Sequence, residues 1–550
     1  MKFYGQMCLL VGSLFAAAHC LAQPIGPPNI LLLVAEDLSP RIGAWGDEVA
    51  STPNIDALAR QSVRYTRAFT AAGVCAPSRA ALIMGQHQIS FGAQHMRTST
   101  GPLGEYYAQP DPELKAFPEL LRRAGYFTFT DSKLDYQFSG VGAGSGPFTI
   151  WDQEGRKAHW RQRAPGQPFF GLINFLETHE SGVMRMDVEP RNPILARTQR
   201  MRQGYGLVAE SVTDPELIAV PRYYPDIPEV RADMARHYDN IHAMDARVGR
   251  ILAELEADGL SDSTIVIWTT DHGDGLPRAK RELLDTGIHV PMLVHVPEAY
   301  RRSGWSQGSD DDRLVSFVDI APTVLAWADV ELPAGLHGVN FLTGNREYVY
   351  ASRDRIDEIR DRQRAARDPR YKYIRSWAPE VPGGHELAYR DNLDMVRAMR
   401  ERWQSDQLNA DQARWFEGAG EEQLYDLHSD PDELTNLIDE RSLAEVAERM
   451  RAALREWLEL VGDMSAIPEA QMRESFLDEG RVPETMIPKI TTNNGFLTAH
   501  SDNSASIGYR TGDGRWRLYT QPVEQDDQRV YFKAVRYGWH ESAVVTVEPQ

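Results

Sequence analysis

Cysteine is scarce in this sequence. Three cysteines, Cys8, Cys20 and Cys75, occur among 550 residues. The first two lie in an N-terminal segment where a lysine is followed by an apolar stretch over residues 7–18 and then by small residues. This order is typical of a secretory signal peptide, so we predict a signal peptide over residues 1–22 and a periplasmic or secreted protein. The mature chain then keeps one cysteine and cannot form an internal disulfide.

Long apolar runs are also scarce. The apolar stretch near the N-terminus is too short to cross roughly 30 Å of hydrocarbon. A retained membrane anchor is therefore the weaker interpretation of this segment, and lipidation of Cys20 is a further alternative. Since no other segment of the sequence is long and apolar enough, we expect no membrane span.

Basic residues are outnumbered by acidic ones. Lys and Arg total 59 against 79 Asp and Glu, which gives a formal net charge of −20. Such a field repels polyanions, so we expect no nucleic-acid partner, and an anionic substrate has to be held by a local cluster of basic groups. With 42% apolar and 25% charged residues, the composition is that of an ordinary globular protein.

From residue 29 onward, short apolar runs alternate with amphipathic stretches. This alternation predicts an α/β fold with a mostly parallel sheet sandwiched by helices. Buried strands are expected at 30–34, 126–130, 169–176 and 264–270, and a long helix at 231–255.

The pattern of predicted elements changes twice along the chain, whose length also exceeds what a single core supports. Strands at 348–351 and 371–374 precede an amphipathic helix at 441–460, and short strands separated by turn residues follow after residue 505. We predict a main α/β domain over 23–345, a smaller α+β subdomain over 346–464, and a linker with a small β-sandwich over 465–550.

The residues that follow the predicted strands are unusually polar. Glu36-Asp37 follow the first strand, Lys133 and Asp135 the second, Glu177 and His179 the third, and Asp271-His272 the fourth. In open α/β sheets, ligands bind outside the carboxyl ends of the strands. Acids, a lysine and histidines converging there indicate a metal site combined with an anion site.

The most informative segment is Cys75-Ala76-Pro77-Ser78-Arg79. Proline just after the cysteine, followed by helix formers, places Cys75 at a helix N-terminus, where free N–H groups and the helix dipole favour an anion. A lone cysteine is more often a buried small hydrophobe. This context, however, matches the CxPSR signature of the type I sulfatases, and the chain resembles that family over roughly residues 29–460.

Further segments resemble the family in the family's own order. They are TPNIDALAR at 52–60, the Lys133 segment, Asp271-His272, Lys280 ahead of GIHVP at 287–291, and LYDLHSDPDELTNL at 424–437. The segment DHGDGLPRAKR at 271–281 is most similar to the branch that includes the heparan N-sulfatases, or sulfamidases. The tail from about residue 489 resembles the small β-domain at the end of some glycosidases and sulfatases.

The resemblance implies an alkaline phosphatase-like sulfatase fold and a defined chemistry. A formylglycine-generating or sulfatase-maturating enzyme would oxidise Cys75 to formylglycine, whose hydrate attacks sulfur and whose second hydroxyl then expels sulfate. Arg79 would stabilise that hydrate, Lys133 and Lys280 would hold sulfate oxygens, and His179 would be the general acid or base.

The resemblance also implies a divalent cation, Ca²⁺ with Mg²⁺ as the alternative. Its ligand positions are Glu36, Asp37, Asp271 and His272, with the modified Cys75 beside the ion. Two of them depart from the family: Glu36 replaces the usual aspartate, and His272 replaces a frequent asparagine, so His272 either ligates the ion or contacts the nucleophile.

The substrate pocket carries a third departure, because Asp135 stands where the family commonly has a histidine. We assign Asp135, His95 and Arg97 to this pocket, with a structural role as the alternative for the segment that holds His95 and Arg97.

The leading hypothesis is an exported sulfatase that cleaves a sulfate ester or sulfamate of a sulfated carbohydrate. A phosphonate monoester or phosphodiester hydrolase is an alternative, because sulfate and phosphate share tetrahedral geometry. A catalytically inactive glycan-binding protein and a thiol hydrolase that uses Cys75 and His179 without a metal are two more.

Overall fold

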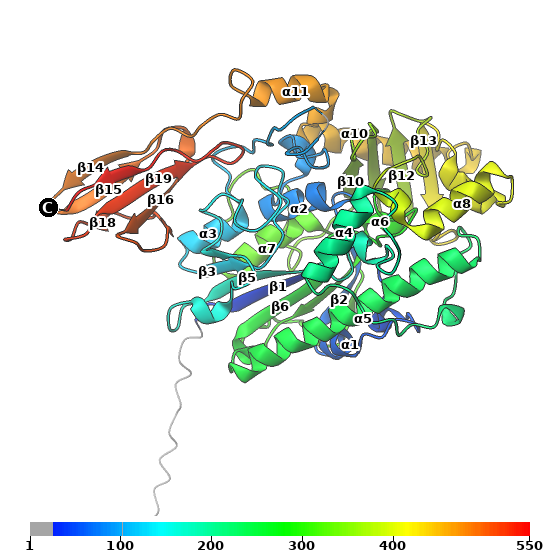
Figure 1. Ribbon diagram of the computed structural model, residues 1–550, viewed down its shortest axis with the longest axis horizontal. Helices are drawn as coiled ribbons and strands as arrows, with labels where there is room; N and C mark the ends of the chain where they lie inside the picture. The colour runs from blue at the N-terminus through cyan, green and yellow to red at the C-terminus, as the bar shows by residue number, and fades with distance from the viewer. Residues whose placement is uncertain (1–25, 102, 550) are drawn as a thin grey trace, which may run out of the picture.

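The computed structural model describes residues 26–101 and 103–549. Figure 1 shows a central α/β body with a small antiparallel sheet and helix α10 at one end and the C-terminal tail at the other. The predicted signal peptide, with Cys8 and Cys20, lies outside the described residues. Within them, no helix combines the length and the apolar character that a membrane span requires.

The central sheet has nine strands within the described residues. In spatial order they are β4 (Gln153–Glu154), β3 (Phe127–Thr130), β5 (Phe169–Phe175), β1 (Asn29–Ala35), β6 (Thr264–Thr270), β7 (His289–His295), β2 (Val63–Phe69) and β8 (Asp310–Asp311), with β9 (Val315–Ser316) also paired to β2. The first five strands in this spatial order, β4, β3, β5, β1 and β6, run parallel to one another, and β7 is antiparallel to both of its neighbours. Every residue of β1, β5 and β6 is buried, as expected for strands covered on both faces.

Helices cover both faces of this sheet, and β1 shows why. Its alternate residues point in opposite directions. Ile30 and Leu32 join a core with helices α2 (Cys75–Met84), α3 (Phe117–Arg123) and α7 (Ile320–Trp327). Leu31 and Leu33 join a second core with α1 (Pro53–Ala59) and the long α5 (Pro228–Ala257). The predicted mostly parallel sheet between helices is thus confirmed.

The smaller α+β subdomain is built on an antiparallel sheet. Its strands are β10 (Val349–Arg353), β11 (Gln363–Arg367), β12 (Tyr371–Ser376) and β13 (Glu422–Asp426), in that order. Helix α10 (Ala444–Val461) buries Met450, Leu454 and Trp457 against Tyr373 and Leu424 of the sheet. The remaining helices of the body and subdomain are α4 (Pro193–Gly204), α6 (Asp285–Ile288), α8 (Asp394–Gln404) and α9 (Ala410–Ala413).

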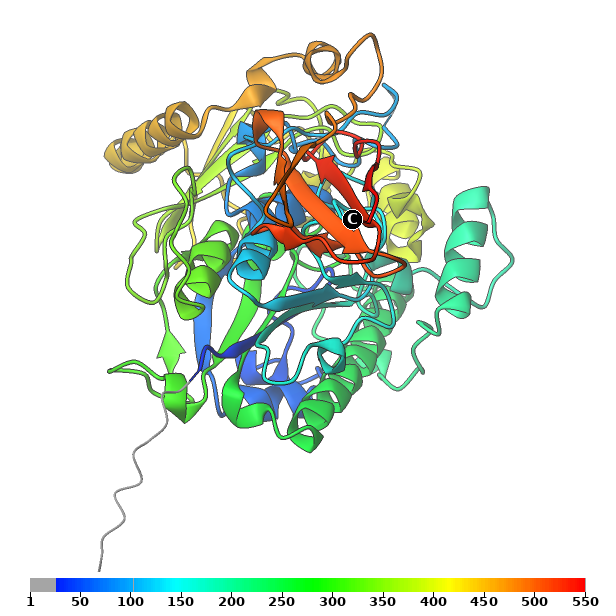
Figure 2. The ribbon, with the colours of Figure 1, turned by 90° about the vertical axis from the view of Figure 1, so that its left-hand side faces the viewer.

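The C-terminal tail begins with helix α11 (Glu469–Phe476) and continues as two small antiparallel sheets. One contains β14 (Lys489–Asn493), β15 (Phe496–His500) and β18 (Val523–Glu524), and the other β17 (Arg517–Leu518), β16 (Ser506–Thr511), β19 (Val530–Val535) and β20 (Val545–Val547). Leu497 from one sheet and Phe532 from the other share a buried cluster, which makes the tail a β-sandwich. Figure 2 looks onto this tail with the body behind it. Tyr537 fixes it there, stacked on Phe138 at 5.0 Å.

A buried ion cluster joins the subdomain sheet to the body. Lys372 on β12 has no exposed surface, and its Nζ lies 2.5 Å from Asp285 Oδ1 and 2.8 Å from Glu433 Oε1. Removing this cation would leave the buried carboxylate of Glu433 facing that of the half-buried Asp285.

We therefore expect Lys372→Met to lower the free energy of unfolding by about 3–5 kcal/mol, measured by urea denaturation. Lys489→Met is the matched control, because the Lys489 side chain is 72% exposed in its pair with Asp502 and should change stability by less than about 0.5 kcal/mol. Equal effects of the two variants would contradict the expectation.

Candidate active site

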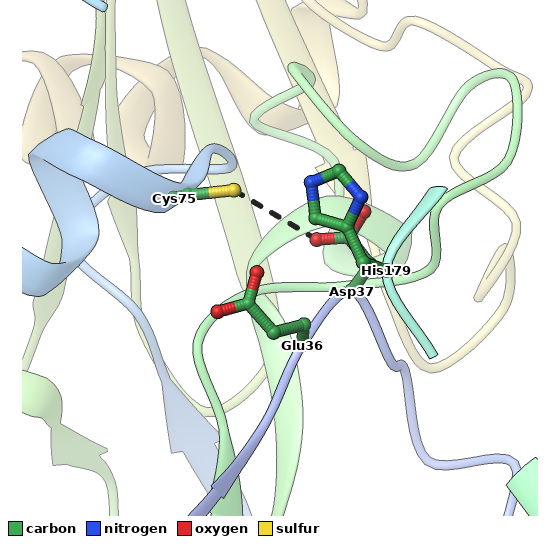
Figure 3. Close-up of side chains that lie close together, drawn as sticks. All are labelled: Glu36, Asp37, Cys75 and His179. Carbon is green, nitrogen blue, oxygen red and sulfur yellow. Dashed lines mark hydrogen bonds between the residues drawn. The ribbon is translucent and has the colours of Figure 1, made fainter. Parts of the chain in front are cut away.

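The site lies at the carboxyl ends of four parallel strands. Glu36 and Asp37 follow β1, Lys133 follows β3, His179 follows β5, and Asp271-His272 follow β6. Cys75, the first residue of α2, points at these strand ends, and Figure 3 shows its sulfur facing Asp37 with Glu36 and His179 alongside. The parallel arrangement alone brings these distant segments together.

Cys75 is the centre of this group. Its Sγ lies 3.3 Å from His272 Nε2, 3.5 Å from Lys280 Nζ and 3.8 Å from Asp37 Oδ1. The side chain has no exposed surface. A nucleophile made at this position would therefore have a lysine, an imidazole and a carboxylate within reach.

Asp37 is held by three groups at once. Its Oδ2 lies 2.5 Å from Lys280 Nζ and accepts the backbone N–H of Glu180 at 2.7 Å, while Oδ1 lies 3.1 Å from His272 Nε2. Burial alone would raise the pKa of Asp37, but Lys280, His179 and His272 outweigh it and hold that pKa well below its usual range. The carboxylate is thus anionic in the folded site.

Glu36 has different surroundings from Asp37. Its carboxylate oxygens lie 2.6 Å from Lys133 Nζ and 3.5 Å from Arg79 Nη1. Burial raises the pKa of Glu36, and the two cations partly offset this rise. Glu36 therefore lies among cations, beside the tighter group that Asp37 forms with Asp271 and His272.

This tighter group has the donor set of a cation site. One donor atom each of Asp37, Cys75, Asp271 and His272 lies within 4.8 Å of all the others. His272 Nδ1 donates to the carbonyl of Gly273 at 2.9 Å, because a carbonyl only accepts. Its Nε2 faces Asp37 Oδ1 and, at 3.6 Å, Asp271 Oδ1. Burial alone would lower the pKa of His272, but the Asp271 and Asp37 carboxylates outweigh it and hold that pKa well above its usual value.

The carboxylates of Asp37 and Asp271 repel one another unless positive charge, either a proton on His272 or a bound cation, lies between them. Asp271 Oδ2 is moreover buried without a hydrogen-bond partner. The residues therefore fit a divalent cation, with oxygen donors typical of Ca²⁺ or Mg²⁺ sites and one imidazole that departs from them. Glu36 belongs to a second, overlapping group with Asp37, Cys75 and His179.

Arg79 links α2 to the loop after β3. Its Nε donates to the carbonyl of Leu134 at 3.0 Å and its Nη2 to that of Lys133 at 2.9 Å, and Nη2 also donates to Asn174 Oδ1. The guanidinium thus holds the backbone of Lys133 in place, and it also lies beside Glu36. These contacts give Arg79 a positioning role toward Lys133, in addition to the role that the resemblance implies.

His179 is oriented to present an N–H group. Its Nδ1 accepts the backbone N–H of Ser181 at 3.2 Å, so the proton of the neutral ring resides on Nε2. Burial lowers the pKa of His179 well below its usual value, and Lys280 adds to this effect. Arg202 donates to Ser181 Oγ at 3.2 Å, which orients this serine toward the imidazole.

Comparison with known proteins now decides the family. The Sulfatase family model matches residues 28–330. This chain belongs to the sulfatase family. It is 35% identical over 530 residues to an ulvan-active sulfatase of Formosa agariphila, covering 90% of this chain and 87% of the relative. The human N-sulphoglucosamine sulphohydrolase is 29% identical over 334 residues, covering 56% of this chain and 62% of the relative. This similarity agrees with the resemblance of residues 271–281 to sulfamidases.

The fold of the sulfatase also matches solved structures. A structure from Bacteroides thetaiotaomicron VPI-5482 assigned to the sulfatases superimposes with a TM-score of 0.56 at 18% identity, over 80% of this chain and 93% of that chain. At this identity the match shows the fold alone, which is the alkaline phosphatase-like sulfatase fold expected from the sequence. Taken with the family match, the chain is a sulfuric ester hydrolase.

Two of the predicted pocket residues, Asp135 and His95, lie in different surroundings in the sulfatase. Asp135 is buried, and its Oδ2 lies 3.7 Å from Lys133 Nζ. His95 instead accepts the backbone N–H of Arg355 at 3.3 Å and faces Glu469 at 4.0 Å. Burial lowers the pKa of His95 to about 4, so the ring is neutral, and its buried Nε2 has no hydrogen-bond partner among the described residues.

Three further residues join the sulfatase site. Glu180 binds Arg281 through two hydrogen bonds of 2.8 and 2.9 Å and lies 3.9 Å from Lys280. Asn174 accepts a hydrogen bond from Arg79 through its Oδ1. Tyr389, which is half-buried, comes from the connection between β12 and β13, and burial together with the nearby Glu180 raises its pKa, an effect that Lys280 partly offsets. The sequence offered one sign that Asn174 has a role in the site, because Asn174 is a polar residue inside the apolar run 169–176.

Removing the cation should stop the sulfatase. We expect exhaustive chelation to abolish sulfate release and to lower Tm, because a ligand at 100 times its Kd stabilises the native state by about 2.7 kcal/mol. Differential scanning calorimetry and elemental analysis before and after chelation measure this, and added Ca²⁺ or Mg²⁺ should restore both properties. In Asp271→Asn, the Tm should respond less to the metal. Full activity of a protein shown to be metal-free would contradict the site.

Proposed function

We propose that this sulfatase releases sulfate from a sulfated carbohydrate, with formylglycine at position 75 as the nucleophile and Ca²⁺ or Mg²⁺ as the metal. The observation that carries the proposal is the position of Cys75, at the start of α2 and within 3.8 Å of Asp37, His272 and Lys280. Two relatives support the carbohydrate, because one is named for ulvan and the other for N-sulphoglucosamine.

Two groups would supply chemistry that the encoded side chains lack. Formylglycine supplies two geminal hydroxyls, one to attack sulfur and one to expel sulfate afterwards. A cation held by Asp37, Asp271 and His272, with Glu36 beside them, supplies Lewis acidity toward the sulfate oxygens.

The encoded residues bind the sulfate and move protons. Lys280 Nζ, 3.5 Å from Sγ, and the neighbouring Lys133 bind sulfate oxygens and stabilise the charge that builds up on them. Asp37, anionic and 3.8 Å from Sγ, accepts the proton of the attacking hydroxyl. His179 hydrogen-bonds through its Nε2–H to the departing sugar oxygen or nitrogen and stabilises the charge that builds up on it.

The proposal includes export and maturation. The signal peptide predicted over residues 1–22 would direct the chain to the periplasm or the medium, and a formylglycine-generating or sulfatase-maturating enzyme would convert Cys75. N-terminal sequencing of the protein recovered outside the cytoplasm tests the export. A first residue at the initiating methionine would contradict it.

The substrate that we propose is a terminal sulfated or N-sulfated hexosamine, cleaved from the chain end. The resemblance of residues 271–281 to sulfamidases supports this choice. The net charge of −20 opposes a long polyanion along an extended groove, and binding of one terminal residue avoids that repulsion.

A panel of defined compounds tests the function, with released sulfate measured by ion chromatography. It contains N-sulfated glucosamine, 6-O- and 2-O-sulfated sugars, sulfated ulvan oligosaccharides, an aryl sulfate, an aryl phosphodiester and choline sulfate. We expect the highest kcat/KM on a sulfated saccharide. Preference for the phosphodiester, or turnover of choline sulfate alone, would overturn the proposal, as would the absence of turnover in protein that contains formylglycine and metal.

A further inference from the structure

Arg97 differs from the other basic residues of the site because it has no acidic partner. Lys133 pairs with Glu36 and Lys280 with Asp37, and Arg281 is bound by Glu180. Among the described residues, no carboxylate oxygen lies within the 4.0 Å of an ion pair from the Arg97 guanidinium, and its buried Nε has no hydrogen-bond partner. This Nε has therefore lost its hydration, and nothing in the described chain replaces it.

The backbone holds Arg97 firmly in this position. On one side, the N–H of Met96 donates to the carbonyl of Arg355 at 2.9 Å, and Arg355 Nη1 returns a bond of 3.1 Å to the carbonyl of Met96. On the other side, Thr98 donates to Gln137 at 3.4 Å. Arg97 itself has a left-handed φ of 56°, a conformation that costs a non-glycine residue roughly 1–2 kcal/mol. Strain retained by fixed flanking residues is typical of functional sites.

The same segment brings Arg97 into the neighbourhood of the nucleophile. Met96 packs in one buried cluster with Cys75. Burial lowers the pKa of the Arg97 guanidinium, and Asp135 and Cys75 more than offset this, so the group remains charged. Arg97 in turn contributes to the lowered pKa of His179, the residue that contacts the leaving group in the proposed mechanism. Arg97 is half-buried, whereas Cys75 has no exposed surface, so Arg97 lies nearer to the solvent.

We propose that Arg97 forms a second anion subsite, which binds a carboxylate or a second sulfate carried by the same glycan next to the sulfate that is cleaved. The inference rests on the proposed function and narrows its substrate class to glycans with two neighbouring anionic groups. The planar fork of arginine matches either group with two parallel hydrogen bonds. Asp135, close by but outside ion-pair distance, leaves the guanidinium available to the ligand.

The test compares four substrates. They are a sulfated disaccharide with a neighbouring uronate, the same disaccharide with that carboxylate reduced to an alcohol, a counterpart with a second sulfate instead, and 4-nitrophenyl sulfate. For the wild-type enzyme we expect kcat/KM to be about 10- to 100-fold higher on one doubly anionic substrate than on the carboxyl-reduced one, the size of one charged hydrogen-bonded contact. Which of the two is preferred identifies the second group.

Arg97→Ala should remove this preference, because it should lower kcat/KM on the doubly anionic substrate far more than on 4-nitrophenyl sulfate, while Arg97→Lys should restore part of the preference. Arg200→Ala, on the exposed surface of α4, is the matched control and should keep the preference. An equal loss on all four substrates would place Arg97 at the cleaved sulfate and overturn the inference, as would a wild-type enzyme without any preference. In either case, sulfate release would still support the proposed function. Only failure of the wild-type enzyme on every substrate would overturn the proposed function and the inference together.

Discussion

Cys75→Ala is expected to abolish sulfate release, with a loss of about 10⁴-fold or more, because it removes the nucleophile. The fold should persist, since Cys75 contributes only a small side chain to the cluster of Val74, Ala76 and Met96. Initial rates on 4-nitrophenyl sulfate measure the loss, and circular dichroism with Tm checks the fold. Residual activity within tenfold of the wild type would exclude Cys75 as the source of the nucleophile.

Cys75→Ser is the more informative companion of this variant. Serine offers one hydroxyl, so it can accept sulfate from the substrate but lacks the second hydroxyl that would expel it. We expect a single, slow turnover that leaves sulfate on the peptide covering residues 68–79, which trypsin releases after Arg67 and Arg79. The same peptide from the wild type should carry formylglycine. A fully active wild-type sample with only unmodified cysteine would contradict the mechanism.

Lys280→Met is expected to damage activity and stability together. It removes the cation that lies 2.5 Å from Asp37 and 3.9 Å from Glu180, in a position where the lysine side chain is 3% exposed. Loss of one partner from a buried ion pair costs about 3–5 kcal/mol, and loss of one group that stabilises transition-state charge costs about 10²–10³ in kcat. Urea denaturation and steady-state kinetics measure the two effects.

Lys157→Met is the matched control for this variant, because Lys157 is exposed and should leave both quantities near those of the wild type. If Lys280→Met retained activity but lost stability, Lys280 would be a structural partner of Asp37 without a role at the sulfate. If it lost neither, the ion pair described above would be wrong.

The central fold was predictable because its strands have a strong local signature. Strands β1, β5 and β6 are buried on both faces and therefore read as continuous apolar runs. Strands β2 and β7 gave no such signal. β2 contains Arg64 and Arg67, and its burial is mixed, while β7 contains a proline. The antiparallel insertion of β7 between β6 and β2 depends on pairing across distant segments, which local pattern cannot reveal.

The site was predictable where residues follow strands and unpredictable where they arrive from elsewhere. Glu36, Asp37 and Asp271 could be assigned because parallel strands end at one edge. Tyr389 could not, since it lies in the connection between β12 and β13, far along the chain. His95 lies two residues before Arg97, yet it belongs with Glu469 of the tail helix α11, a contact that only the folded chain reveals.

The burial of helix α2 sets an order of events during biosynthesis. All residues of α2, including 75–79, are buried in the folded protein, so an enzyme that oxidises Cys75 has to reach the segment while the chain is still unfolded. The period for doing so ends when β6 and the Lys280 segment, synthesised about 200 residues later, have closed over the helix. If Cys75 is matured as proposed, the fraction of matured enzyme in a preparation would be set by competition between oxidation and folding, and protein that has folded with its thiol intact would have to unfold before it could be matured.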